Sequence, residues 1–363
     1  MVVKSNYNIV IKQVIIIFLA PLLIMASTSY GQQSTINDTV HEVTRLFSST
    51  EVLPIKLVYS NKEMRNETND STYLKSELVY QSESGSWDTL AVKLRARGNN
   101  RRENCYFPPV KIRIKKSVRA GTLFEGNKKL KLVLPCLIQN DNNDNVLKEY
   151  MAYKLYEIIS PFHYKTRRVS IDFTEVRRNK TVNHKLKGIL IEDIDLVAER
   201  HNGKELKRAV HPMEQDNICS VQNDFFQYMI GNTDFSVTYQ HNEKLIFTRD
   251  KKTMPVPYDF DMSGLVNASY SVVSQVQNET LSITSVTQRL YRGFRRNPSI
   301  YEKVRQEFLS KKTQMFQIID GLESSFDNPR EFTAARDFIA EFFPVIADDT
   351  KYKSRILNKA RIK

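Results

Sequence analysis

Two runs of alternating basic and apolar residues constrain the fold of this chain more than any other feature. Each run carries three basic residues spaced two apart: Lys93, Arg95 and Arg97 in the first, and Lys111, Arg113 and Lys115 in the second. A period of two is typical of β-strands, whose side chains point alternately to opposite faces. If the two strands are neighbours, six cations share one face and repel one another unless an anionic group covers them. A phosphate chain would suit such a face, and a solvated basic surface is the alternative.

The periodicity of the remaining sequence predicts a strand-rich first half and a helical second half. Strands are expected at residues 51–60, 73–81, 87–97, 128–138, 166–173 and 186–192, and helices at 146–159, 216–230, 284–294, 300–324 and 330–343. A chain of 363 residues with this division suits two lobes or two small domains. Glu149 is expected in the first turn of its helix, where it either complements the helix dipole or pairs with a strand lysine.

The stretch 228–264 gathers the polar groups that metal–phosphate chemistry uses. Asp234 comes first, His241 and Asn242 follow, and Asp259 and Asp261 then lie two positions apart among apolar residues. On a strand, these last two carboxylates would share a face, where they repel each other and are costly to bury. A divalent cation would remove much of that cost, since Mg²⁺ takes one or two carboxylates together with phosphate oxygens. The alternative is that Asp259 caps a turn and Asp261 pairs with an arginine.

The first 31 residues have the features of a secretory signal peptide. Lys4 and Lys12 precede or flank an apolar run at 15–24, small residues follow, and cleavage is expected before Gln32. An uncleaved anchor is the alternative, although the apolar run is short for a membrane span. Removal of this segment, which holds two lysines and no acid, lowers the formal net charge from +13 to +11.

The positive charge and the export signal together limit the kinds of molecule that this chain is expected to bind. A charge of this size favours phosphates, acidic glycans or anionic surfaces. We expect no nucleic-acid partner and no stable membrane anchor after cleavage, with the periplasm or the cell surface as the destination.

The three cysteines offer one disulfide in an exported protein. Cys105 and Cys136 both flank strand-like runs and are the preferred pair, and three free buried thiols are the alternative. No Cys-x-x-Cys or His-rich pattern indicates a structural zinc site.

A basic strand-rich half followed by a helical half with Asp, Asn and Asp-x-Asp is the order of parts in protein-kinase-like enzymes. The usual kinase signatures, Gly-x-Gly-x-x-Gly, His-Arg-Asp and Asp-Phe-Gly, are missing. The sequence resembles the spore-coat protein H (CotH) kinase-like family, a family of exported atypical kinases. The resemblance spans about residues 90–265 and rests on seven segments: Arg-Gly-Asn-Asn-Arg-Arg (97–102), Phe-Pro-Pro-Val-Lys-Ile-Arg-Ile (107–114), Leu-Lys-Glu-Tyr-Met-Ala-Tyr-Lys-Leu (147–155), Leu-Ile-Glu-Asp-Ile-Asp (190–195), Gly-Asn-Thr-Asp (231–234), His-Asn (241–242) and Pro-Tyr-Asp-Phe-Asp-Met-Ser-Gly (257–264).

This resemblance implies an α+β fold that is bilobal and protein-kinase-like. After the signal peptide (1–31) and a polar lead-in (32–50), it implies a strand-rich N-terminal lobe at 51–195 and a mostly helical C-terminal lobe at 196–363. It also implies Mg²⁺ or Mn²⁺ as cofactor and ATP as substrate.

The resemblance further assigns a role to each matched residue. It makes Asp234 the catalytic aspartate. The residues near the nucleotide would be Arg97, Arg101, Lys111 and Glu192, and Glu149 would hold Lys111 in position. The metal ligands would be Asn242, Asp259 and Asp261. Eight positions separate Asp234 from Asn242, whereas the corresponding residues of typical protein kinases are five apart.

Three functions are compatible with these features. The first is an exported kinase that moves a phosphoryl group from ATP to a Ser or Thr hydroxyl of another exported protein. The second is a catalytically inactive module that holds an anionic glycan or a protein partner on its basic face. The third is a phosphotransferase acting on a sugar or another small molecule, which a family fold does not distinguish from the first.

Overall fold

The computed structural model describes residues 1–2, 42–98, 100–138, 142–274 and 281–362. The chain divides into two compact units, Met1–Thr39 and Val40–Lys363, and every element below belongs to the second. Apart from residues 1–2, the predicted signal peptide lies outside the described residues. In the part of the chain that is described, no helix combines the length and apolar character needed to cross a membrane.

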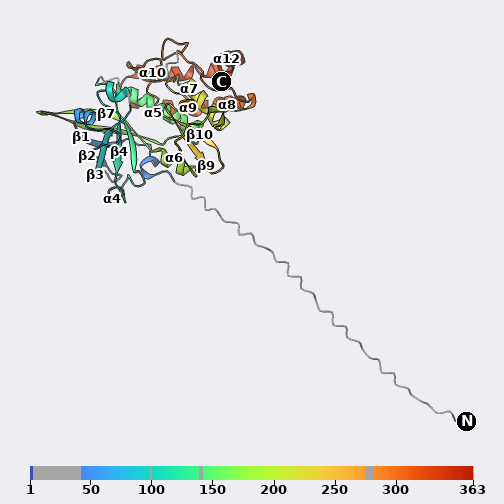
Figure 1. Ribbon diagram of the computed structural model, residues 1–363, viewed down its shortest axis with the longest axis horizontal. Coiled ribbons are helices and arrows are strands. Elements are labelled where there is room, and N and C mark those ends of the chain that lie inside the picture. The colour runs from blue at the N-terminus through green and yellow to red at the C-terminus, as the bar shows by residue number, and fades with distance from the viewer. Residues whose placement is uncertain (3–41, 99, 139–141, 275–280, 363) are drawn as a thin grey trace. The chain divides into compact units, whose positions relative to one another are not determined.

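Seven strands close into a β-barrel (Figure 1). They are β1 (Leu53–Tyr59), β2 (Leu74–Gln81), β3 (Trp87–Ala96), β4 (Val110–Ile114), β5 (Lys129–Val133), β6 (Thr166–Arg177) and β7 (Lys180–Ile191). The hydrogen-bonded order is β1-β2-β3-β4-β5-β7-β6, and β6 returns to β1. The β1–β6 pair is parallel, with Leu53 opposite Val169, and the other neighbours are antiparallel.

The two basic runs form neighbouring strands as expected, but Arg97 and Lys115 lie just beyond the strand ends, so four of the six cations are on the paired strands. In the antiparallel β3–β4 pair, Lys93 lies opposite Arg113 and Arg95 opposite Lys111. The apolar residues between them are buried in the barrel, so the basic side chains occupy the outer face. One cation on this face already has an anionic partner, because Asp70 lies 2.7 Å from Arg95.

A three-stranded antiparallel sheet and most of the helices form the rest of the described unit. The sheet has the order β10-β9-β8 and contains β8 (Gly203–Leu206), β9 (Glu243–Thr248) and β10 (Thr253–Pro257). The helices are α1 (Arg45–Ser48), α2 (Asn61–Asn66), α3 (Asn100–Asn104), α4 (Lys116–Arg119), α5 (Asn142–Ile159), α6 (Ile194–Arg200), α7 (Asn217–Met229), α8 (Pro298–Ser310), α9 (Lys312–Asp320), α10 (Pro329–Ala340), α11 (Phe343–Ala347) and α12 (Asp349–Arg355). Helices α5 and α7–α12 share one apolar core, and the barrel encloses another.

The predicted bilobal, protein-kinase-like fold is wrong. The strands of the first half form a closed seven-stranded barrel instead of the separate strand-rich lobe of such a fold, and the second half adds a three-stranded sheet to its helices. Closure depends on the parallel pairing of β1 with β6, whose partners Ile55 and Ile171 are far apart in sequence. A pairing at this separation leaves no local pattern in the sequence.

Two local predictions also need correction. Residues 284–294 form turns, bends and irregular chain instead of a helix. Arg289 and Arg292 of this segment donate to the backbone carbonyl oxygens of Met229, Thr233 and Phe235. The helix expected at 146–159 begins at Asn142, so its glutamate at position 149 lies beyond the first turn. That position removes the helix-dipole interpretation of this residue.

The preferred cysteine pair is confirmed, since Cys105 and Cys136 form a disulfide. It ties the end of α3 to the segment that follows β5. The backbone N–H of Tyr106 also donates to the carbonyl oxygen of Cys136 at 2.7 Å. The third cysteine, Cys219, is free and buried in α7.

Candidate functional site

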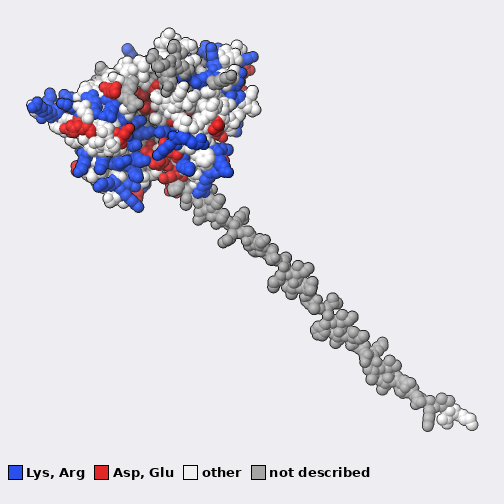
Figure 2. All heavy atoms as spheres, viewed as in Figure 1, with Lys and Arg blue, Asp and Glu red and all other residues white. Residues whose placement is uncertain are grey.

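A cavity of about 760 Å³ lies where the end of β3 meets the loops around β9 and β10. Six of the predicted site residues line it: Arg97, Arg101, Asp234, Asn242, Asp259 and Asp261. The fold thus brings together motifs from distant parts of the chain. Figure 2 shows Lys and Arg over much of one face of the described unit, with Asp and Glu in smaller groups between them. The cavity combines both signs of charge within a mostly cationic protein.

A narrow loop returns Asn242 to Asp234. Ser236 and His241 form an antiparallel bridge, in which the backbone N–H of each donates to the carbonyl oxygen of the other at 3.1 and 3.0 Å. The side-chain amide of Asn242 then donates to Oδ2 of Asp234 at 3.0 Å and to its backbone carbonyl oxygen at 2.6 Å. The φ angle of Asn242 is +55°, a left-handed conformation that asparagine tolerates better than most residues.

The carboxylate of Asp234 is held in its charged form by three side chains. Ser274 donates to Oδ1 at 3.0 Å, Nε2 of His241 lies 3.3 Å from the same oxygen, and Asn242 occupies Oδ2. Burial alone would raise the pKa of Asp234, but these hydrogen bonds outweigh it and hold the pKa below its usual value. The hydrogen bond between His241 and Asp234 in turn raises the pKa of His241 above its ordinary value.

Buried side-chain amides connect the Asp234 loop to the protein interior. In α7, Asn223 donates to Glu243 at 2.9 Å and accepts from Gln227 at 3.2 Å. Gln227 accepts from Asn232 at 2.8 Å, and Asn232 accepts from the backbone N–H of Asp234 at 2.9 Å. This hydrogen-bond chain fixes the loop against β9. The sequence analysis missed it, although polar amides spaced four apart on an apolar helix are a usable signal.

The expectation that Asp259 and Asp261 lie on a strand is wrong, but both still line the cavity. β10 ends at Pro257, and Asp259 has a φ angle of +65°, so the strand period of two does not apply. The backbone N–H of Asp259 donates to the hydroxyl of Tyr153 at 3.0 Å, and Phe260 is fully buried. A tight turn anchored by two aromatic residues therefore directs both carboxylates into the cavity.

Arg101 lies between two buried carboxylates. Its Nη1 is 3.7 Å from Oε2 of Glu149, and its Nε is 3.5 Å from Oδ2 of Asp261. Its Nη2 donates to the carbonyl oxygen of Leu134 at 2.8 Å, close to the disulfide. Glu149 therefore pairs with Arg101 and not with Lys111, contrary to what the resemblance implied. Burial raises the pKa of both carboxyl groups even beside the guanidinium, since one cation faces two anions.

Two predicted nucleotide residues lie outside this cavity. Lys111, on β4, lines an adjoining cavity of about 500 Å³. Glu192 is buried at the end of β7, where it accepts hydrogen bonds from Arg200 at 2.7 and 3.0 Å and from the backbone N–H of Lys165 at 2.6 Å. The geometry of Glu192 is that of a structural ion pair.

The adjoining cavity contains a lysine that the sequence analysis did not assign. Lys131 lies opposite Lys111 in the β4–β5 pair, and its Nζ is 4.6 Å from the ring centre of Tyr164 and 4.2 Å from that of Tyr258. Burial, together with the charge of Arg97, lowers the pKa of Lys131 to about 7. The signal was present, because basic and apolar residues also alternate along β5.

The two cavities are neighbours. Gln240 and Lys244 line both of them, and the charges of Arg97 and Asp259 in the larger cavity act on Lys131 in the smaller one. A ligand longer than one phosphate group can therefore contact both sets of side chains.

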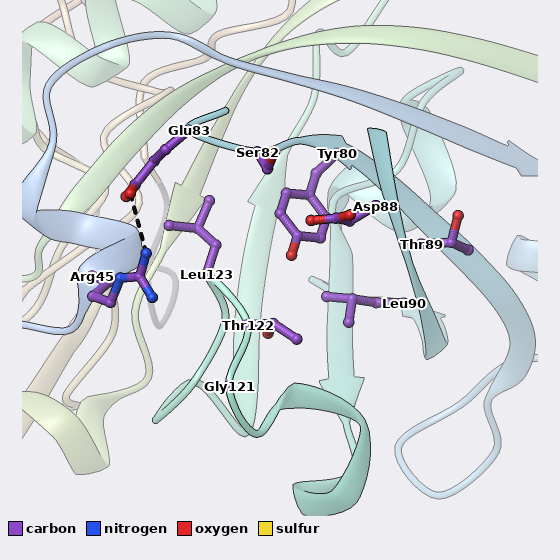
Figure 3. Close-up of a pocket in the computed structure, with 10 residues that line it drawn as sticks. All are labelled: Arg45, Tyr80, Ser82, Glu83, Asp88, Thr89, Leu90, Gly121, Thr122 and Leu123. Carbon is purple, nitrogen blue, oxygen red and sulfur yellow. Dashed lines mark hydrogen bonds and ion pairs between the residues drawn. The ribbon is translucent and has the colours of Figure 1, made fainter. Parts of the chain in front are cut away.

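A third hollow, of about 420 Å³, lies on the barrel and is shown in Figure 3. Two of its charged groups are already paired, because Arg45 lies 3.1 Å from Glu83. None of the predicted site residues lines it. We therefore place the candidate site in the larger cavity.

The donor set of the larger cavity fits a hard cation that arrives with a phosphate ligand. Within the described ranges, no three His, Cys, Asp or Glu side chains are close enough to hold a metal ion by themselves. Mg²⁺ needs only one or two carboxylates when phosphate oxygens and water complete its shell. Asp259, Asp261 and the side-chain amide of Asn242 line this cavity and are the groups that would hold such a cation.

Comparison with known proteins adds no assignment. No protein-family model matches the chain, and no curated protein matches it. The resemblance to the spore-coat protein H family remains a prediction from the motifs quoted above.

Proposed function

We propose that this chain is an exported, metal-dependent phosphotransferase that moves a phosphoryl group from ATP to a Ser or Thr hydroxyl of another exported protein. The observation that carries the proposal is the mixed charge of the 760 Å³ cavity. Arginines, carboxylates and an asparagine line it together. A polyphosphate bound to a divalent cation presents both charges, whereas an acidic glycan presents only one.

Each group has a role that follows from its chemistry. Arg97 and Arg101 are suited to phosphate oxygens, because guanidinium groups bind them through charge-assisted hydrogen bonds. The carboxylates of Asp259 and Asp261 and the side-chain carbonyl oxygen of Asn242 would hold Mg²⁺ or Mn²⁺, which would neutralise charge on the phosphates. Asp234, kept ionised by its hydrogen bonds, would orient the acceptor hydroxyl and take its proton.

The adjoining cavity supports a nucleotide-sized ligand. Tyr164, Ile194 and Leu245 provide apolar walls, and Lys111 and Lys131 add positive charge beside them. Such a combination suits a nucleoside with its first phosphates. Lys111 would then contact the nucleotide in this second cavity and not beside Asp259.

The test is thermal unfolding of residues 32–363 with Mg-ATP or Mn-ATP. A ligand that binds only the native state adds about 2.7 kcal/mol of stability at 100 times its dissociation constant. The wild type should gain stability only when metal and nucleotide are both present, and Asp259→Ala should lose that gain. Asp172→Asn, at a surface ion pair with Lys185, is the matched control and should keep it.

An anion-binding module without catalysis is the second candidate. Lys111, Lys129, Lys131, Lys207 and Lys244 all line the smaller cavity, and this is the observation that favours it. The same experiment separates the two functions. Stabilisation by sulfated or carboxylated glycans, with none from metal–nucleotide, would replace the phosphotransferase proposal.

A further inference from the structure

The segment 270–274 lies along the acidic side of the cavity. The hydroxyl of Ser271 donates to the backbone carbonyl oxygen of Asp261 at 3.4 Å, and Ser274 donates to the side chain of Asp234 at 3.0 Å. Val272 also lines the cavity, with its side chain 61% exposed, whereas Ser274 is only 6% exposed. The segment therefore lies against the cavity along its length, and its last residue, Ser274, is buried next to Asp234.

Ser274 has the geometry of an acceptor residue. Its hydroxyl donates to Oδ1 of Asp234 at 3.0 Å. This contact is not needed to satisfy the carboxylate, because His241 lies against the same oxygen and Asn242 donates to the other one. A serine hydroxyl hydrogen-bonded to the aspartate that would take its proton is the starting arrangement for hydroxyl phosphorylation.

We propose that Ser274 is an internal phosphorylation site, modified by the cavity of the same chain. This inference rests on the proposed function, and it specifies a first acceptor for that function. The Oγ of Ser274 forms a bond to the γ-phosphorus of ATP, the bond between that phosphorus and the bridging oxygen breaks, and ADP leaves. The proton of the Ser274 hydroxyl passes to the carboxylate of Asp234.

Placement in one continuous chain makes this acceptor effective. Ser274 needs no encounter with a second molecule, since the contacts of Ser271 with Asp261 and of Ser274 with Asp234 hold the segment in position. An intramolecular acceptor gains the large advantage that proximity gives over a bimolecular reaction. The modification should therefore proceed at a rate that does not depend on protein concentration.

The first test is phosphopeptide mapping of residues 32–363 after incubation with Mg-ATP. We expect close to one phosphate per chain on Ser274, at a first-order rate that is unchanged on dilution. Ser274→Ala should lose at least about 90% of the label, because an internal acceptor has no equivalent substitute. Ser84→Ala, in an exposed turn of the barrel, should keep the label, and Asp234→Asn should abolish it. Normal thermal unfolding of each variant shows that its fold is intact.

A second test needs no nucleotide. Ser274→Cys and Val272→Cys are compared for their rate of reaction with N-ethylmaleimide, with the buried Cys219 of the unsubstituted chain as background. Because thiol reactivity follows exposure, the cysteine at position 272 should react at least about ten times faster than the one at position 274. Equal rates would show that residue 274 is not held against Asp234 and would overturn the inference.

The outcomes separate this inference from the proposed function. If metal–nucleotide stabilises the chain and phosphate reaches other residues or an added protein but not Ser274, the internal site is refuted and the phosphotransferase stands. If metal–nucleotide neither stabilises the chain nor labels it, both proposals fail.

Discussion

Glu243→Gln tests whether the buried hydrogen-bond chain behind the Asp234 loop holds an uncharged carboxyl group. The side chain of Glu243 is 2% exposed, and its two oxygens accept hydrogen bonds from Gln215 at 3.1 Å and Asn223 at 2.9 Å. Both partners are neutral amides. Burial raises the pKa of Glu243 to about 8, and the two amide hydrogen bonds offset only part of that effect.

The magnitude follows from the change in pKa between the unfolded and folded chain. The pKa rises from 4.5 to about 8, and at 1.36 kcal/mol for each pH unit the ionised group costs the folded state up to about 5 kcal/mol. The folded chain keeps a proton that the unfolded chain loses in this range, so wild-type stability falls by about 1.4 kcal/mol per pH unit between pH 4.5 and 8. A glutamine at this position does not titrate and has no such loss.

The assay is urea-induced unfolding of both proteins, with EDTA present, at several pH values from about 5 to 8. Between about pH 5 and pH 7, the free energy of unfolding of the variant relative to the wild type should rise by about 2–3 kcal/mol. Glu77→Gln, at an exposed position of β2, is the control and should run parallel to the wild type. Parallel curves for Glu243→Gln as well would refute a neutral Glu243.

Three further predictions concern the site and its support. Arg101→Met should destabilise the chain by about 3–5 kcal/mol in urea unfolding, because it leaves two buried carboxylates without their cation, and it should remove the thermal shift given by Mg-ATP. Replacement of Cys105 and Cys136 by serine should cost about 4 kcal/mol in the same assay, the loop-entropy value for a separation of 31, and an unchanged midpoint would contradict a stabilising disulfide. Lys131 is charged below a pKa of about 7, so the dissociation constant for metal–nucleotide should increase up to about tenfold per pH unit above pH 7 in calorimetric titration, and Lys131→Met should lack this dependence.

The sequence predicts the elements of this fold better than their assembly. The paired strands β3 and β4 follow from a period of two that repeats with the same charge, and α7 follows from its apolar spacing. Barrel closure does not follow, because the contact between Ile55 and Ile171 depends on the length and twist of every strand between them. The sequence analysis also did not predict α6 and β8, because both are short elements in or beside a mostly polar stretch and their positions depend on packing.

Within the site, motif residues are easier to predict than the side chains that complete the cavity. Arg97 and Asp259 belong to recognisable motifs, and the fold places them 4.0 Å apart. Lys131 and Ser274 belong to none, and only the pairing of β5 with β4 and the path of the chain after Asp261 bring them to the two cavities. Their roles depend on neighbours, so no single-sequence pattern can assign them.

The eight-residue spacing between Asp234 and Asn242 illustrates why distance along the chain is a poor measure of whether two site residues are in contact. A longer loop costs little extra entropy to close, and here the Ser236–His241 bridge closes it with two backbone hydrogen bonds. The bridge requires left-handed backbone at Gln240 and Asn242, with φ angles of +51° and +55°. Asparagine tolerates that conformation and also supplies the amide that bonds Asp234, so the departure from the usual spacing leaves the pair in direct contact.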